Sequence, residues 1–258
     1  MVQVSAFDVT APSFDRHRSL PDGVPEAIRS AILGVVASPR PRLLDLGAGT
    51  GRIGHAFVDA GDDYVALDLS FGMLREFARR GNARLVQADG ARLPFGNASF
   101  DGVMLIQVFG GMRGWRDVLA ETRRVLRPAG ALVIGRNVAP DDGVDAQMKQ
   151  RLDAILDESG ARPERLNARN EALRVLKEDA RATRLEAATW TAARTPRGFL
   201  ERHRTGARFA ALPVPTKDEA LRRLAAWASD AFGSLDAALS ERHAFELQVF
   251  RFAQRENF

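Results

Sequence analysis

The sequence predicts an α/β protein built on a mostly parallel sheet, and three observations carry this prediction. Short apolar runs recur through the first half of the chain, at residues 42–47, 64–68, 84–88 and 102–107. Stretches with apolar residues at helical spacing lie between these runs. Most of the runs end beside a glycine or an aspartate, and the carboxyl ends of parallel strands are where such sheets bind ligands.

The composition is that of a globular protein of 258 residues, with 45% hydrophobic and 27% charged residues. The chain has no cysteine, which excludes disulfides, thiolate metal sites, iron–sulfur clusters and enzymes that use a cysteine nucleophile. No apolar run approaches the ~20 residues that span a bilayer, and the N-terminus lacks the apolar core of a signal peptide. We therefore expect a soluble cytoplasmic protein without membrane insertion.

The charge is basic, with a net charge of +4 and an isoelectric point of about 10.2. All but three of the 37 basic residues are arginines, which bind phosphate well, so a nucleic-acid partner has to be considered. The arginines are scattered and interleaved with acidic residues, which is typical of an ordinary surface. This pattern favours a partner other than nucleic acid and keeps RNA as an alternative.

The first 41 residues precede the first predicted strand. Residues 1–22 are irregular and contain an aromatic and basic cluster at Phe14–Arg18. A helix is predicted for Glu26–Ser38, where apolar residues share one face, and Pro39 and Pro41 end it.

The stretch Arg42–Arg52 reads RLLDLGAGTGR and holds the strongest motif of the chain. Its apolar start is typical of a buried parallel strand, and Gly47, Gly49 and Gly51 then follow at every second position. Glycines at such a turn permit positive φ angles and let a ligand approach the backbone closely. A helix starting at about Arg52 would direct its N-terminal N–H groups at that ligand.

Two ligand classes compete for this turn. Gly49, Gly51 and Gly54 match the G-x-G-x-x-G string of dinucleotide sites, but the match is out of phase with the strand. Counted from Gly47, which should close the strand, an arginine stands where the third glycine belongs. Asp45 also opposes a dinucleotide, because its carboxylate would repel a pyrophosphate. The stretch closely resembles the D-h-G-x-G-x-G signature of class I S-adenosylmethionine (SAM) methyltransferases, whose ligand carries positive charge instead.

This resemblance is strong over residues 43–137, and it implies an α/β fold with a Rossmann-like seven-stranded sheet, an antiparallel last strand and a helical cap inserted after strand 5. It implies SAM as the cofactor, bound by Asp45, Gly47, Ala48, Gly49, Gly51, Asp68, Leu69, Met73, Asp89, Gly90 and Gln107. Asp68 is expected to accept hydrogen bonds from the ribose hydroxyls, and Asp89 one from the adenine amino group. Gln107 is expected beside the sulfonium.

The elements after the turn continue the alternation as far as residue 137. Ser70 is predicted to cap a helix that runs to about Arg80 and directs Met73 inward. Asp101 begins a strand on the rim opposite the cofactor and is expected to have a capping role. The remaining elements of this half are strands at 64–68, 84–88, 102–107 and 131–137 and an amphipathic helix at 115–127.

The second half departs from this alternation. Residues 141–183 are polar and helical, and the segment is too long for a loop. A strand is predicted at 184–194, followed by a helix capped by Thr195 and a helix opened by the capping box of Thr216. The last predicted strand is 244–253, which the resemblance places antiparallel in the sheet.

These elements divide the chain into four predicted segments. Residues 1–41 form an N-terminal lid and helix, and residues 42–140 form the SAM-binding Rossmann-like core. Residues 141–183 form a helical substrate cap, and residues 184–258 complete the sheet with extra helices. The lid and cap functions are implied by the resemblance.

The predicted function is transfer of the SAM methyl group to a small-molecule acceptor by in-line displacement. The sulfonium already activates the methyl group, so the enzyme must chiefly align the acceptor, and we assign no catalytic residue. Gln107 cannot act as a general base near neutral pH, and His55 is interpreted as a packing or surface residue. The sequence has no metal-ligand spacing. The alternatives are an RNA methyltransferase, a non-catalytic SAM-binding protein and, more remotely, a dehydrogenase.

Overall fold

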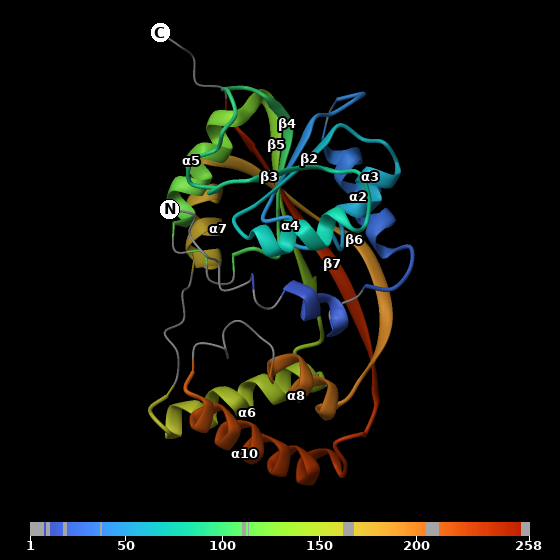
Figure 1. Cartoon of the computed structure of the whole chain (residues 1–258), viewed down its shortest axis with the longest axis vertical. Coiled ribbons are helices and arrows are strands. Elements are labelled where there is room, and N and C mark those ends of the chain that lie inside the picture. The colour runs from blue at the N-terminus through green and yellow to red at the C-terminus, as the bar shows by residue number, and fades with distance from the viewer. Residues whose placement is uncertain are drawn as a thin grey trace.

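The protein folds around one seven-stranded sheet, seen in a computed structural model (Figure 1). The structure describes residues 8, 11–17, 20–36, 38–109, 112, 114–161, 168–204 and 212–253, without the side chains of residues 13, 16 and 17. In spatial order the strands are β3 (Arg84–Gln87), β2 (Tyr64–Asp68), β1 (Leu43–Leu46), β4 (Phe100–Ile106), β5 (Leu126–Val138), β7 (Leu239–Phe252) and β6 (Ala180–Arg194). The first five strands are parallel, and β7 is antiparallel to both of its neighbours. This confirms the predicted sheet and its antiparallel last strand.

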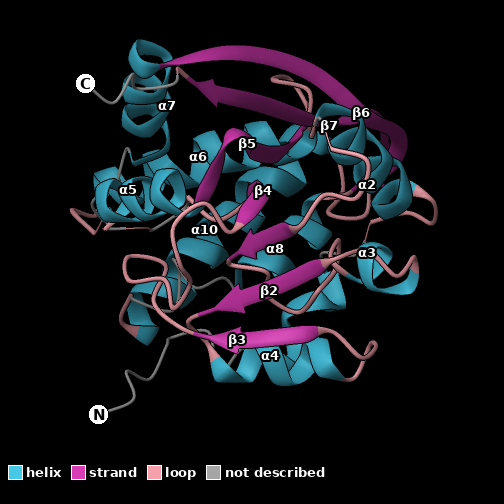
Figure 2. Ribbon diagram, turned by 90° about the horizontal axis from the view of Figure 1, so that it is seen from above, coloured by secondary structure: helices cyan, strands magenta, loops and turns pink. Residues whose placement is uncertain are grey.

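Helices cover both faces of the sheet, as Figure 2 shows from above. One face carries α2 (Val24–Val35), α3 (His55–Asp59) and α4 (Phe71–Ala78), and the other carries α5 (Trp115–Val125) and α7 (Ala168–Asp179). Strands covered in this way read as continuous apolar runs, because both sides of each strand are buried. All four residues of β1 are buried accordingly.

A separate helical layer lies beyond the carboxyl edge of the parallel strands (Figure 1). It consists of α6 (Val144–Glu158), α8 (Pro196–Arg204) and α10 (Val214–Phe232), which share an apolar core of their own. The short 3-10 helix η1 (Ala11–His17) contacts both α4 of the sheet domain and α8 of this layer. The long strands β5, β6 and β7 extend past the edge and connect the layer to the sheet.

The helical layer is assembled from two stretches of the chain. Of the segment 141–183, α6 belongs to this layer, whereas α7 packs on the sheet beside α5 through Ala168, Ala172, Leu173 and Leu176. The layer is completed by α8 and α10, which follow β6. The sequence could not reveal this partition, because the apolar faces of α6 and α7 are alike and only their tertiary partners differ.

Strands β1 to β4 lie within about two residues of their predicted bounds, whereas β5, β6 and β7 begin four or five residues earlier than predicted. The early starts shorten the helix predicted to 127, which ends at Val125, and the helical segment predicted to 183, which ends at Asp179. The helix predicted from about Arg52 begins at His55, after a turn in which Gly54 already has helical backbone angles and the His55 N–H donates to the Gly51 carbonyl at 2.9 Å. The capping box of Thr216 is wrong, because α10 starts at Val214 with a proline in its first turn, where a fixed φ suits a helix start. Among the helices that the structure describes, none combines the length and apolar character needed to cross a bilayer.

Candidate active site

The glycine turn lies at the carboxyl end of β1 and is shaped by packing on two sides. Gly47, Gly49 and Gly51 all have positive φ angles, of 78°, 59° and 78°. A Cβ on Gly47 would overlap Val108, and one on Gly51 would overlap the ring of Phe77. A Cβ on Gly49 would meet nothing within 4 Å. The outer two glycines therefore allow tight packing, and the middle one leaves open space above the turn.

Asp45 is buried beneath this turn, with an exposed fraction of 3%. Its Oδ2 accepts a hydrogen bond of 2.6 Å from the hydroxyl of Tyr64, the only tyrosine of the chain. Its Oδ1 is buried without a hydrogen-bond partner among the described residues. Burial raises the pKa of Asp45 to about 7, although the Tyr64 hydrogen bond opposes the shift, and the nearby charge of Asp68 adds to it. The carboxyl group is therefore held close to its titration point near neutral pH.

Asp68 ends β2 directly beside the turn. Its Oδ2 accepts the backbone N–H of Gly49 at 2.9 Å, and its Oδ1 accepts the N–H of Ser70 at 2.8 Å. Burial raises the pKa of Asp68, the two backbone N–H groups lower it, and the charge of Asp8 raises it again. Each carboxylate oxygen can accept a second hydrogen bond, so the oriented Asp68 remains able to bind a ligand hydroxyl.

The other predicted residues of the adenosine side occupy the same edge. Leu69 is apolar and yet 39% exposed, so its side chain offers an apolar surface on which a flat aromatic ring can lie. Met73 is buried in α4, where its N–H is capped by the Ser70 hydroxyl at 3.2 Å as predicted. Asp89 is exposed after β3 and its Oδ1 accepts the N–H of Ala91, while Gly90 packs near Val118.

Gln107 follows β4 and takes a conformation that is rare for a residue with a side chain. Its φ is +57°, and its N–H donates to the carbonyl of Gly135 on β5 at 2.9 Å. Its Oε1 accepts a hydrogen bond of 2.9 Å from Arg52, the residue after the glycine turn. The Arg52 side chain therefore links the turn to the end of β4. The two glycines at 110 and 111, shortly after Gln107, lie outside the described residues.

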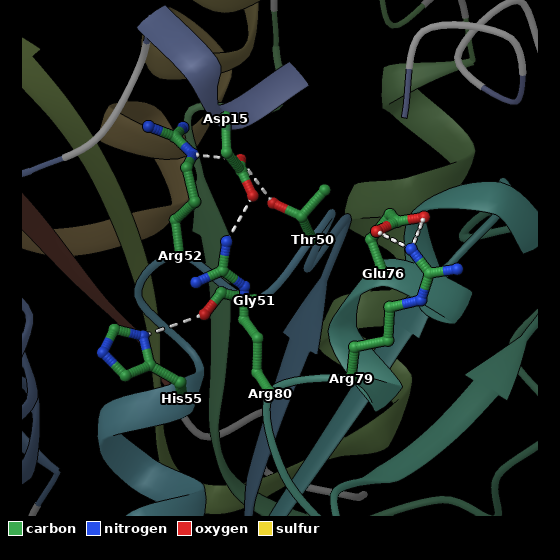
Figure 3. Close-up of polar contacts among 8 residues, drawn as sticks. All are labelled: Asp15, Thr50, Gly51, Arg52, His55, Glu76, Arg79 and Arg80. Atoms are coloured by element: carbon green, nitrogen blue, oxygen red, sulfur yellow. Dashed lines mark hydrogen bonds and ion pairs between the residues drawn. The ribbon is translucent and has the colours of Figure 1, made fainter. Parts of the chain in front are cut away.

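The N-terminal segment is bound to the turn through Asp15 of η1, as Figure 3 shows. The Asp15 carboxylate accepts a hydrogen bond of 2.7 Å from the Thr50 hydroxyl and forms ion pairs with Arg52, at 3.6 Å, and with Arg80. Asp8, further toward the N-terminus, accepts hydrogen bonds from the Ser70 hydroxyl and from the backbone N–H of Gly72 in α4. Arg18 of the predicted cluster lies outside the described residues.

Sequence reasoning missed the residues that hold the turn in place. Thr50 was skipped as a spacer between glycines, although it is a buried polar residue in a turn, and Tyr64 was assigned only to a strand. His55, interpreted from the sequence as a packing or surface residue, is half-buried, and its Nδ1 lies 3.1 Å from the carbonyl oxygen of Gly51. Contacts such as those of Asp8 and Asp15 have no local sequence signal, because each joins residues far apart in the chain.

The carboxyl edge of the parallel strands has the properties that a cationic adenosyl ligand requires. The Asp45 oxygen that has no partner among the described residues suits a nearby positive charge, and the exposed Leu69 beside Asp68 suits an adenine next to a ribose. The open space above Gly49 allows a ligand to lie against the backbone. Asp68 suits the ribose of either ligand, but Asp45 close to the turn would oppose a pyrophosphate, so the residues present fit SAM better than a dinucleotide.

Comparisons with known proteins agree with this interpretation. The methyltransferase domain family matches residues 44–134. A demethylmenaquinone methyltransferase of Renibacterium salmoninarum is 34% identical over 165 residues, which are 61% of this chain and 70% of that protein. A malonyl-acyl carrier protein O-methyltransferase of Enterobacter lignolyticus is 34% identical over 129 residues, half of each chain. The present chain thus spans only part of the length of these relatives.

The fold is shared with solved structures over almost its whole length. A putative type II methyltransferase from Anaeromyxobacter dehalogenans superposes with a TM-score of 0.65 and 21% sequence identity, over 92% of this chain and 98% of that one. The matches to the methyltransferase family and to its sequence relatives exclude the dehydrogenase interpretation of the glycine turn. The chain belongs to the class I SAM-dependent methyltransferases, and it is an enzyme whose cofactor is SAM.

Proposed function

We propose that this enzyme transfers the methyl group of SAM to a small-molecule acceptor bound between the sheet edge and the helical layer. The observation that carries the proposal is that β5, β6 and β7 hold this layer opposite the carboxyl edge, beyond the end of β4. The two relatives support it, because they are named for demethylmenaquinone and for a malonyl group on a carrier protein.

The residues proposed to hold SAM are those predicted at the edge: Asp45, Gly47, Ala48, Gly49, Gly51, Asp68, Leu69, Met73, Asp89, Gly90 and Gln107. Asp45 would balance the positive charge of the methionine part, and Asp68 would accept hydrogen bonds from the ribose. Asp89 is exposed for the adenine, whereas the burial of Met73 favours a packing role beneath it. Bound SAM supplies a methyl group made electrophilic by its sulfonium.

The protein then contributes to the reaction by aligning the acceptor with the methyl group and by excluding water from the site. Holding an acceptor in line with the methyl group can contribute ~7–11 kcal/mol to lowering the barrier. Arg52 fixes the side chain of Gln107 by a hydrogen bond of 2.9 Å, and so sets the polar lining at the end of β4. We assign no general base, because Gln107 does not titrate and an ionised or enolised acceptor needs none.

Two covers are proposed for this site. The segment 1–41 acts as a lid through η1, supported by the contacts of Asp15 with Thr50, Arg52 and Arg80. The helical layer of α6, α8 and α10 acts as the substrate cap, so that the cap includes part of the segment 141–183 and part of 184–258.

The charge pattern also supports a small acceptor over RNA. Several arginines of the described surface pair with carboxylates, among them Arg29 with Asp62 at 2.6 Å and Arg197 with Asp236 at 2.6 Å. Pairs of this kind neutralise the basic charge that phosphate binding would require. Salt-sensitive binding of tRNA would contradict this conclusion.

Calorimetric titration with SAM, S-adenosylhomocysteine and NADH tests the cofactor assignment. Gly49→Ala should weaken SAM binding by about tenfold or more, because its new methyl group fills the open space above the turn. Gly61→Ala is the matched control, since Gly61 also has a positive φ, of 74°, and nothing within 4 Å of a Cβ. Equal losses in the two variants, or binding of NADH in preference to SAM, would contradict the proposed site.

Transfer from methyl-labelled SAM tests the acceptor class. We expect label in the small-molecule fraction of a bacterial extract and none in its RNA. Label that enters RNA alone would overturn the small-molecule proposal while leaving the SAM site intact.

A further inference from the structure

Three arginines gather around one glutamate next to the proposed methyl-transfer position. Arg136 of β5 donates to Glu246 of β7 through Nη2 at 3.0 Å and Nε at 3.3 Å. Arg184 of β6 donates to the other carboxylate oxygen of Glu246. These two arginines lower the pKa of Glu246 against the opposing effect of burial, so it is ionised near neutral pH.

Arg169 is the third member of this arginine cluster (Arg136, Arg169 and Arg184). It is half-buried at the second residue of α7, and within the described part of the chain it forms no hydrogen bond or ion pair. Burial lowers the pKa of Arg169, repulsion by Arg136 and Arg184 lowers it further, and only Glu246 opposes them. Among the described residues, one carboxylate thus faces three guanidinium groups, so this part of the structure carries more positive than negative charge.

The position of the cluster relates it to the reaction. The Gln107 N–H binds the carbonyl of Gly135, the residue before Arg136, and neighbouring strands lie about 4.8 Å apart. Arg169 lies at the carboxyl edge as well. The end of α7, at Asp179, lies at the opposite edge, because the next residue, Ala180, pairs with Phe252 at the end of β7 farthest from Gln107. The start of α7, which holds Arg169, therefore lies at the carboxyl edge. The cluster therefore lies beside Gln107 over β5, β7 and β6, on the side away from the proposed adenosine residues of β1, β2 and β3.

The side chains of Arg136 and Arg184 are 41% and 59% exposed, so a ligand can reach them, whereas Arg169 is half-buried. Repulsion between neighbouring cations is unfavourable, and a bound anion relieves it. Guanidinium groups bind planar or tetrahedral oxyanions with paired hydrogen bonds, and the N-terminal end of α7 adds a favourable dipole. We propose that Arg136, Arg169 and Arg184 bind an oxyanion of the methyl acceptor, a carboxylate or a phosphate, and so select acidic acceptors. This inference rests on the proposed function, because it places the acceptor next to Gln107.

Binding of simple probes tests the inference without knowledge of the natural acceptor. The full chain, saturated with S-adenosylhomocysteine, is titrated with benzoate, phenyl phosphate and neutral benzamide. We expect one or both anions to bind at least tenfold more tightly than benzamide, and the better anion identifies the oxyanion. Equal affinities, or no saturable binding of either anion, would overturn the proposal.

Two variants connect the binding to the cluster. Arg169→Gln should weaken anion binding about tenfold and leave the melting temperature unchanged or higher, because it relieves repulsion and breaks no ion pair. Arg174→Gln is the matched control on α7, where the arginine pairs with Glu178 at 2.8 Å. A lower melting temperature with unchanged anion binding in Arg169→Gln would show a structural role. If the wild type does not bind S-adenosylhomocysteine, the proposed function is overturned instead. The anion titration is then carried out without this ligand, and its result still tests the arginine cluster.

Discussion

Replacing Asp45 with asparagine should remove a large part of the pH dependence of stability between about pH 4 and pH 7. Asp45 is buried, and its pKa is raised from 3.8 to about 7 in the folded protein. The folded state therefore holds a proton that the unfolded state has lost in this range, and stability falls as the pH rises. A shift of about 3 units at 1.36 kcal/mol per unit corresponds to about 4 kcal/mol.

Urea unfolding of both proteins at a series of pH values measures this effect. The stability of Asp45→Asn relative to wild type should increase by about 4 kcal/mol from pH 4 to pH 8, with most of the change below pH 7. Tyr64→Phe is a useful companion variant, because it removes a hydrogen bond that lowers the pKa and so extends the falling range upward. Parallel stability curves for wild type and Asp45→Asn would show that Asp45 is ionised throughout, and would refute the reasoning.

The same carboxyl group should couple SAM binding to proton release. A cation near Asp45 favours its ionised form, so binding at pH 6 should release on the order of one proton. Calorimetry in buffers with different ionisation enthalpies measures this number. A binding heat that does not depend on the buffer would separate Asp45 from the cofactor.

Three further predictions concern the parts that support the site. Ser70→Ala should lower the free energy of unfolding by about 1 kcal/mol, because the cap of α4 at the Met73 N–H is lost; urea unfolding measures it, and an unchanged midpoint would contradict the cap. Asp15→Asn should speed cleavage by trypsin near η1 several-fold and weaken SAM binding, because the ion pair with Arg80 is lost; unchanged cleavage would argue against a lid. Glu241→Ala should destabilise the helical layer by about 1–3 kcal/mol, because the α6 N–H at Val144 loses its acceptor at 2.7 Å; hydrogen exchange in α6 that matches wild type would contradict this.

Sequence patterns determined the core of the fold because its signals are local. The apolar runs ending at Gly47, Asp68 and Asp89 marked three parallel strands, and β2 has the predicted bounds Tyr64–Asp68. The hydroxyls of Ser70 and Thr195 accept N–H groups from α4 and α8 as predicted, because a cap depends only on neighbouring residues. The phase of the glycines relative to β1, together with Asp45, favoured SAM over a dinucleotide.

Features that join distant parts of the chain were decided only by the tertiary structure. The hydroxyl of Tyr64 meets Asp45 because β1 and β2 are neighbours in a particular register, and this contact gives Asp45 its unusual chemistry. Likewise, Arg169 and Glu246 belong to one charged cluster only because α7 leaves the helical layer and packs on the sheet.

The sequence by itself determined which residue types lie at the carboxyl edge, since strand periodicity and turn chemistry act over a few residues. The three-dimensional structure decided which of them are buried, paired or left with excess charge. Burial and electrostatic interaction depend on every group within several ångströms, whatever its position in the chain. The protonation of Asp45 and the charge of the arginine cluster are therefore properties of the folded protein alone.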